Sequence, residues 1–509
     1  MNSRSFLGNA FYSMFARVLY LLTRLAIPPM VLAHIGLQEY GLWSIAFVLV
    51  SYLGLSVSGF ATVYVREIAR AYHQQDIGDA RQIISTGVFC TLLIGGLGCL
   101  LLWFCLPTLL TALDVAPAQQ PMARQLLLGT TLIFLADMTL GVAGYILHGL
   151  QRLDLQQQIW TVSFLLEWLL LALFLHLGWG VYALLAAFAL RYLYSIIASS
   201  WQVHRLWPAL RPSWRDISLQ QIRRLGQFSL LTQGSDLLAV LLHSADRLLL
   251  GARFGTSATA LHDLGSKLPS TAISIPSAIS QAVLAHASHP SLLSQPEARA
   301  ALYQRALRLN LLVLLLPMPY LWLLPNSICI AWLGPTGQLA ILQQILLWTT
   351  PVWHLHILTG PASSLMRAQG AVRYEFLYHA LRATALLLAW LASTTLGGFV
   401  AIAAIGQGLA ALLYLLCTAG PLQLPYRFLL QQILLPLLLA YLLAASLQPW
   451  LDLSDQASRA DAWRNLLMAA AISLPPAILL FVLQLRPNER EQGVRFWQRR
   501  RWGGKHHVA

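Results

Sequence analysis

Long apolar segments recur along the whole chain, with short polar loops between them. Each can cross a bilayer as a helix, which takes about 20 apolar residues. Only 10% of the 509 residues are charged, whereas a soluble protein is about a quarter charged. Because the segments lack the alternating polarity of barrel strands, the sequence predicts an all-α polytopic membrane protein. We expect about fourteen transmembrane helices, at 8–33, 40–65, 83–112, 122–148, 157–177, 181–204, 226–252, 257–284, 303–330, 338–363, 374–396, 400–420, 428–447 and 465–485.

The distribution of positive charge predicts the orientation in the membrane. The chain has 33 Lys and Arg against 19 Asp and Glu. With a cytoplasmic N-terminus, 23 of these cations fall in the cytoplasmic loops and tail, and four fall outside, namely Arg124, Arg253, Arg459 and Arg464. This asymmetry follows the positive-inside rule and places both termini in the cytoplasm. No polar domain exists to bind nucleic acid, so we expect the basic tail at 495–502 to contact anionic membrane lipid.

A short motif occurs twice, 221 residues apart. Gly149, Arg152 and Asp154 follow the fourth expected helix, and Gly370, Arg373 and Glu375 follow the tenth. The loops after the fifth and eleventh helices also match, as Leu-Gly-x-x-Val at 177–181 and 396–400. Two halves of six helices then enter from the same side, as in transporters whose binding site lies between parallel repeats. We predict an N-terminal lobe at 1–206, a basic cytoplasmic connector at 207–225, a C-terminal lobe at 226–420, and the last two helices with the tail at 421–509.

The catalytic motifs that we considered are absent from the sequence. It has no Walker A loop, no nucleophile elbow and no histidines at zinc-binding spacing. The polar loops are too short to build a soluble catalytic site. We therefore expect no catalytic residues, no metal, no cofactor and no enzymatic activity.

Charged residues inside the expected helices are the candidates for function, because a bilayer tolerates charge only where it is paired or used. Arg24 lies in the middle of the first helix and has no acidic residue three or four positions away. Arg17 lies on the same face of that helix, two turns earlier, where snorkelling to the interface is an equal alternative. The candidates for substrate binding are Arg24, Arg17, Arg191, Lys267 and Arg382.

Three carboxylates are candidates for ion coupling, namely Asp137, Glu167 and Asp236. Pairing with Arg24 or Arg191 explains Glu167 equally well. Lys267 has Asp263 four residues earlier, so a local ion pair is an alternative to substrate contact. Arg382 is similarly open, with Tyr378 and Glu375 one and two turns away. For Asp246 and Arg247, near the outer interface, we favour a structural ion pair.

The N-terminal part of the chain resembles a known family. The first hairpin closes with HIGLQEYGLW at 34–43, and the second helix carries SYLGLSVSGF at 51–60 and ends in VREIAR at 65–70. Together with the Gly149–Arg152 element, these segments resemble the Wzx-type polysaccharide repeat-unit flippases of the multidrug/oligosaccharidyl-lipid/polysaccharide exporter superfamily. The resemblance implies two six-helix lobes around a cavity that opens alternately to each side of a bacterial inner membrane. It also implies a substrate of undecaprenyl-diphosphate-linked oligosaccharide, moved to the periplasmic leaflet for the synthesis of a surface polysaccharide.

Other functions remain open at this point. A lipid II flippase has the same fold and also a cationic cavity. A cation-coupled multidrug exporter of the same superfamily would favour acidic cavity residues, which Asp137, Glu167 and Asp236 could supply. A membrane-embedded glycosyltransferase or polymerase would need a long periplasmic loop with paired carboxylates, which the sequence lacks. Such enzymes are instead candidate partners of a flippase.

Overall fold

The computed structural model describes residues 19–150, 152–223, 242, 244–274, 276–277, 279–280, 283, 295–315, 317–369, 371, 373–452 and 458–484. In these ranges the regular structure is helical throughout, without a strand. Seven helical segments of the described chain are long and apolar enough to cross a membrane. The predicted all-α polytopic membrane fold is confirmed.

The outer faces of the long helices are apolar, as contact with lipid requires. On α3 (Ile77–Ala112), Phe104 exposes 71% of its surface and Leu101 exposes 65%. A soluble monomer rarely leaves such large side chains uncovered over a contiguous face. These surfaces are therefore covered by hydrocarbon in the folded protein.

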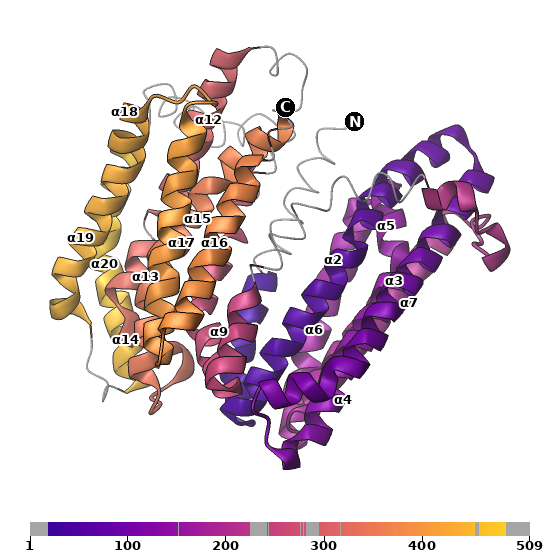
Figure 1. Cartoon of the computed structure of the whole chain (residues 1–509), viewed down its shortest axis with the longest axis horizontal. Helices are drawn as coiled ribbons and strands as arrows, with labels where there is room; N and C mark the ends of the chain where they lie inside the picture. The colour runs from indigo at the N-terminus through magenta and orange to yellow at the C-terminus, as the bar shows by residue number, and fades with distance from the viewer. Residues whose placement is uncertain are drawn as a thin grey trace, which may run out of the picture. The chain divides into compact units, whose positions relative to one another are not determined.

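The chain divides into two compact units. Unit 1 comprises Met1–Thr271 and Gly370–Tyr414, and unit 2 comprises Ala272–Gln369 and Leu415–Ala509. Figure 1 shows the helices by their labels. The predicted lobe boundaries at 206 and 420 stay a prediction.

Unit 1 begins with a helix over Leu19–Leu32. The helices that follow in unit 1 are α2 (Leu37–Gln74), α3, α4 (Gln120–Leu140), α5 (Val142–Gly149), α6 (Leu153–His176), α7 (Tyr182–Leu206), α9 (Thr256–Thr271), α16 (Arg373–Ala392) and most of α17 (Leu396–Ala419). Short 3-10 turns occur at Pro117–Gln119 and Trp214–Asp216. Within this unit α2 packs along α3, α4, α5 and α9, and α6 packs along α7.

Unit 2 contains α12 (Pro296–Leu314), α13 (Pro317–Leu323), α14 (Pro325–Leu333), α15 (Leu339–Ala368), α18 (Tyr426–Phe428), a π-helical turn (Leu429–Leu434), α19 (Leu435–Leu451) and α20 (Arg459–Gln484). The ninth expected helix, at 303–330, is wrong as one continuous span, because the helical segment Pro296–Leu323 ends before Leu324 and α14 begins at Pro325. Pro325 stands first in α14, after the non-helical Leu324. Proline has no amide hydrogen for the preceding turn, so the helix restarts there.

The second expected helix, at 40–65, is longer in the structure, where α2 continues to Gln74. Residues after position 65 are good helix formers but polar, so a pattern of apolar residues marks only the part of α2 inside the bilayer. The third helix likewise begins at Ile77, six residues before the expected start. Both extensions belong to the end of unit 1 where the sequence predicts cytoplasm.

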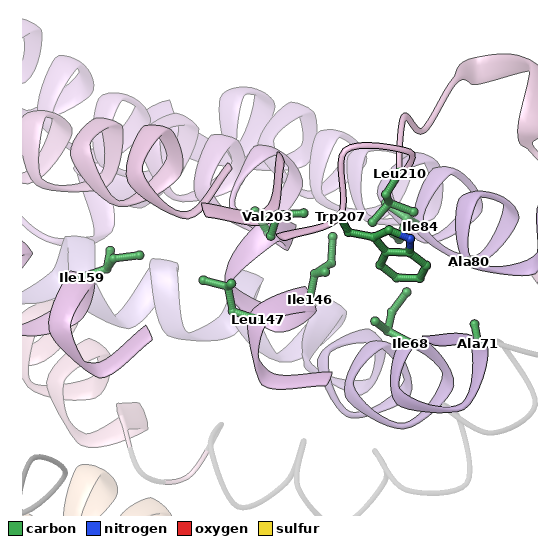
Figure 2. Close-up of a cluster of buried hydrophobic side chains, with 11 residues drawn as sticks. Ile68, Ala71, Ala80, Ile84, Ile146, Leu147, Ile159, Val203, Trp207 and Leu210 are labelled. Carbon is green, nitrogen blue, oxygen red and sulfur yellow. The ribbon is translucent and has the colours of Figure 1, made fainter. Parts of the chain in front are cut away.

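A buried apolar cluster holds this end of unit 1 together (Figure 2). Trp207 and Leu210, which follow α7, contact side chains from α2, α3 and α5. The members are Ile68, Ala71, Ala80, Ile84, Ala143, Ile146, Leu147, Ile159, Val203, Trp207 and Leu210. The predicted connector is therefore packed onto the unit from its first residue.

Hydrogen bonds attach the rest of the connector to the start of α3. The amide of Ser213 donates to Ser85 Oγ at 3.1 Å, and the amide of Ser218 donates to Thr86 Oγ1 at 3.0 Å. Gln221 Nε2 donates to Asp79 Oδ1 at 2.8 Å. Side chains near the start of α3 thus accept hydrogen bonds from the connector. The connector's arginines at 211, 215 and 223 remain exposed.

The repeated Gly-x-x-Arg-x-acid motif has a structural cause in its first copy. A Cβ on Gly149 would lie 3.0 Å from the side chain of Ile68 and 3.1 Å from the carbonyl oxygen of Val65, so glycine lets α5 approach α2 closely. Arg152 then donates to both oxygens of Asp154, at 2.9 and 2.8 Å, beside the start of α6. In the second copy Gly370 lies outside the described residues, and Arg373 lies over the ring of Tyr374.

The motif at 34–43 brings α2 against α9. Tyr40 Oη donates a 3.0 Å hydrogen bond to Asp263 Oδ2 on α9. At the next residue, Gly41, an added Cβ would collide with the carbonyl oxygen of Thr256. The Tyr-Gly pair therefore supplies a polar contact and the space that the close approach of two backbones needs.

We expect Gly41→Ala to destabilise the protein by about 1–3 kcal/mol, as overpacking of a close contact does. The reason is that the colliding atom belongs to the backbone of α9 and cannot rotate away. Thermal unfolding of the detergent-solubilised protein measures the effect. Gly36→Ala is the matched control, because a Cβ at Gly36 meets nothing within 4 Å. Equal melting temperatures for the two variants would contradict this account.

In unit 2, Asp452 fastens the end of α19 to the start of α14. Its carboxylate accepts from the amides of Asn326 and Ser327, both at 3.1 Å, and from Ser327 Oγ at 2.9 Å. Asn465 of α20 also donates to Ser327 Oγ, at 2.8 Å. The free amides at the start of a helix favour such a carboxylate, so the last two helices are anchored at this point.

Candidate functional site

Arg24, the strongest candidate from the sequence, lies in the first helix of unit 1. Its Nη2 donates to Glu167 Oε2 of α6 at 2.9 Å. The side chain of Arg24 keeps 19% of its surface exposed, against 6% for Glu167. Arg24 is thus the accessible member of a pair whose other member is buried.

Arg191 of α7 approaches the same carboxylate oxygen. Its Nη1 lies 3.2 Å from Glu167 Oε2, and its side chain is 9% exposed. The two alternatives for pairing Glu167 are both realised, because one carboxylate oxygen accepts from both arginines. We call Arg24, Arg191 and Glu167 the arginine pair and its carboxylate.

Aromatic rings enclose the arginine pair. The Arg24 guanidinium carbon lies 5.3 Å from the ring centre of Tyr20 and 5.2 Å from that of Phe164. The Arg191 guanidinium carbon lies 4.5 Å from Phe164, 4.2 Å from Tyr192 and 5.6 Å from Phe188. Phe164 therefore contacts both cations. Cation–π contacts in such a desolvated place are each worth about 2 kcal/mol, and they fix Arg191 more firmly than Arg24.

A second carboxylate, Asp137 of α4, acts on Arg191 through its charge. Gly141 makes room for it, since a Cβ there would lie 2.8 Å from Asp137 Oδ1. Among the described residues no hydrogen-bond donor to the Asp137 side chain is found. Asp137 thus lies beside the arginine pair without bonding to it, and its role in ion coupling stays a prediction.

A separate charged cluster surrounds Asp263 on α9. Lys267 Nζ lies 3.1 Å from Asp263 Oδ2, which confirms the local ion pair. Arg247 Nη2 lies 3.0 Å from Asp263 Oδ1, so the partner of the Arg247 guanidinium is Asp263 and the predicted pairing with Asp246 is wrong. With Tyr40 the aspartate has three partners and is 3% exposed. This cluster joins α2, the helical residues 244–254 and α9.

The remaining candidates lie apart or outside the described residues. Arg382 on α16 is 5% exposed, and its guanidinium lies 5.6 Å from the ring centre of Tyr378. Arg17 and Asp236 fall outside the described residues. In the described ranges no group of three or more His, Cys, Asp or Glu side chains could hold a metal ion.

The aromatic residues of the site are not among the residues predicted from the sequence. Tyr20 precedes Arg24 by four residues, Phe164 precedes Glu167 by three, and Phe188 precedes Arg191 by three. These spacings place each ring on the same helix face as its charge, so the signal was present. Which helices meet could not be read from the spacing.

The arrangement suits the binding of an anion. Two guanidinium groups with a single shared hydrogen-bonded carboxylate leave several donors unused, and Arg24 Nε is buried without an acceptor among the described residues. Guanidinium forks match phosphate oxygens in a bidentate manner. Organic cations would be repelled by the same pair of charges.

Comparisons with known proteins identify the family and the fold. The profile of the family described as polysaccharide biosynthesis protein matches residues 6–285. No curated protein matches the sequence. Among solved structures, the chain resembles the lipid II flippase MurJ in an inward closed conformation, with 13% identity and a TM-score of 0.68, over 94% of this chain and 98% of MurJ.

Multidrug transporters have the same architecture. An inward-facing multidrug resistance MATE family transporter of the MOP superfamily is 16% identical with a TM-score of 0.63, over 80% of this chain and 94% of that chain. Its outward-facing conformation gives 16% and 0.60 over 81% and 93%. The expected resemblance to this superfamily is confirmed for the fold. The chain belongs to the polysaccharide biosynthesis protein family and has the fold of these multi-pass membrane transporters.

Proposed function

We propose that this protein is a flippase that moves undecaprenyl-diphosphate-linked oligosaccharide from the cytoplasmic to the periplasmic leaflet of the bacterial inner membrane. The observation that carries the proposal is the arginine pair inside the helices of unit 1, with Arg24 partly exposed. A lipid-linked diphosphate must bring its charge across a region hostile to charge, while its hydrocarbon tail can remain in lipid. The two arginines can pair with the diphosphate while it crosses this region.

Alternating access of two lobes completes the proposed mechanism, since flipping needs conformational change and no covalent step. Arg17, Lys267 and Arg382 are further proposed substrate contacts, and Asp137, Glu167 and Asp236 are proposed for ion coupling. Lys267 is already paired with Asp263, so it ranks behind Arg24 and Arg191. Polysaccharide polymerase and glycosyltransferases of the same pathway are proposed partners.

A lipid II flippase is the second candidate, favoured by the likeness to MurJ over 94% of the chain. Lipid II also carries a diphosphate, so the arginine pair fits both substrates. The glycan separates them, because lipid II bears a peptide that a repeat-unit oligosaccharide lacks. A multidrug exporter of organic cations fits less well, because each carboxylate near Arg24 lies beside a guanidinium.

The test uses the purified protein in vesicles. We expect it to move a fluorescent undecaprenyl-diphosphate-linked oligosaccharide between leaflets without ATP, because the chain has no phosphate-cradling loop. Intrinsic ATPase activity, or transfer of sugar from a sugar nucleotide, would reject the flippase. Faster movement of lipid II than of the oligosaccharide would select the second candidate.

The orientation is tested separately by reporter fusions. We expect fusions within 205–225 to report cytoplasm and fusions within 452–461 to report periplasm. The segment 205–225 alone carries five of the 23 cations on the predicted inner side, and loops rich in Lys and Arg stay on the cytoplasmic side. A periplasmic connector would overturn the predicted orientation.

A further inference from the structure

Glu167 shares a single oxygen between two arginines. Arg24 Nη2 lies 2.9 Å and Arg191 Nη1 lies 3.2 Å from the same atom, Oε2. The arginines come from the first helix and from α7, and the glutamate comes from α6. One carboxylate thus holds three helices of unit 1 in register around one point of negative charge.

The two arginines are held unequally. Arg191 has three rings around its guanidinium and is almost fully buried. Arg24 has two rings, twice the exposed side-chain fraction of Arg191, and an Nε without an acceptor in the described chain. Arg24 can therefore exchange its acceptor, whereas Arg191 is fixed in place.

We propose that Glu167 is an internal counter-anion that occupies the place of a substrate phosphate on the arginine pair. This inference rests on the proposed function and deepens it. When a diphosphate binds, a phosphate oxygen replaces Glu167 Oε2 on Arg24, while Arg191 keeps the carboxylate as its partner. When the lipid leaves, the carboxylate bridges both cations again and offsets one of their two positive charges.

Competition of this kind makes release possible. A pair of bare arginines in a low-dielectric site would hold a diphosphate too strongly to let it go, whereas a tethered carboxylate is always present to displace it. Glu167 therefore lowers the affinity for the diphosphate and raises the rate of release. A structural role alone would lower stability on removal of Glu167 and would leave affinity unchanged or reduced.

The experiment measures binding and turnover of the Glu167→Gln variant. We expect the purified variant to bind undecaprenyl diphosphate about tenfold tighter than the unmodified protein, which corresponds to about 1.4 kcal/mol. We expect flipping in vesicles to slow by a similar factor, because release becomes limiting. Asp114→Asn is the matched control: it also removes one negative charge, from an exposed residue whose φ of 53° asparagine tolerates.

Unchanged or weaker binding by Glu167→Gln at full thermal stability would overturn the inference. If that variant does not fold, binding is measured with Glu167→Asp instead. Its shorter side chain keeps the negative charge but moves the carboxylate oxygen away from the arginines. Tighter binding by Glu167→Asp supports the exchange, and unchanged or weaker binding rejects it. Inorganic pyrophosphate serves as a second probe: tightening for both probes locates the effect at the phosphates, and tightening for neither rejects it.

If the proposed function is wrong, the binding measurements give a different pattern of results. If the unmodified protein does not bind undecaprenyl diphosphate, or if Arg24→Ala binds it equally well, the arginine pair is not the substrate site. If the unmodified protein binds and Arg24→Ala does not, but Glu167→Gln gives no tightening, only the counter-anion role of Glu167 is rejected.

Discussion

Arg24→Ala is expected to abolish export of surface polysaccharide, and Arg24→Lys is expected to retain part of it. Alanine removes both the charge and the donors, and hydrogen bonds to a charged group contribute about 1.5–3 kcal/mol each. Losing two such contacts corresponds to a loss of substrate affinity of roughly 100-fold or more. Lysine keeps the charge but loses the planar fork. Export is measured in a strain that carries only the variant copy.

Normal membrane abundance of the Arg24→Ala protein is part of this prediction. In the structure Glu167 still has Arg191 at 3.2 Å when Arg24 is removed, so the carboxylate is not left unpaired. Arg124→Ala is the control, because it removes a cation from an exposed position. Full export by Arg24→Ala, or a loss that degradation explains, would transfer the site to Arg191, Lys267 or Arg382.

Asp263→Asn is expected to be the most destabilising of these substitutions. It leaves two cations, Arg247 and Lys267, beside a neutral amide in the interior of unit 1. Removing one partner of a buried charge network costs about 3–5 kcal/mol. The expected result is a strong loss of thermal stability in detergent and low membrane abundance.

Lys267→Met provides the comparison within the same cluster. It removes one cation, but Arg247 and Tyr40 still serve the carboxylate, so we expect a smaller loss of stability than for Asp263→Asn. Asp114→Asn controls for the loss of a carboxylate at an exposed position. A melting temperature for Asp263→Asn equal to that of Asp114→Asn would show that the cluster contributes nothing to stability.

The sequence was sufficient for the helical membrane fold and for the individual charges that matter. Apolar length and the scarcity of charge are local properties, so the helices around Arg24, Glu167 and Arg191 could be predicted one by one. Pairing is not local: Arg24 and Glu167 are 143 residues apart. The sequence left Arg24 and Arg191 as alternative partners of Glu167, and the packing of the first helix, α6 and α7 brings both to it.

The errors have equally physical origins. Hydropathy alone joins 303–330 into one span, although the helix ends before Leu324 and restarts at Pro325. The sequence places Asp246 directly beside Arg247, and proximity along the chain alone favours pairing between these two neighbours. In the structure the Arg247 guanidinium instead reaches Asp263, which lies on the next helix. Tyr40 was recognised as part of a motif, but its partner Asp263 is 223 residues away.

The attachment of the connector to α3 has a consequence for the order of assembly during synthesis. Ser85 and Thr86 reach the ribosome exit long before their partners Ser213 and Ser218, which follow 128 and 132 residues later. At translation rates of about 5–20 residues per second, that interval is roughly 7–26 s. Through this time the first helices are already in the membrane, while their polar side chains at the start of α3 still bond to water. Unit 1 cannot close this end until its sixth expected helix has been inserted, so the nascent chain waits in an open form that insertion factors can still reach.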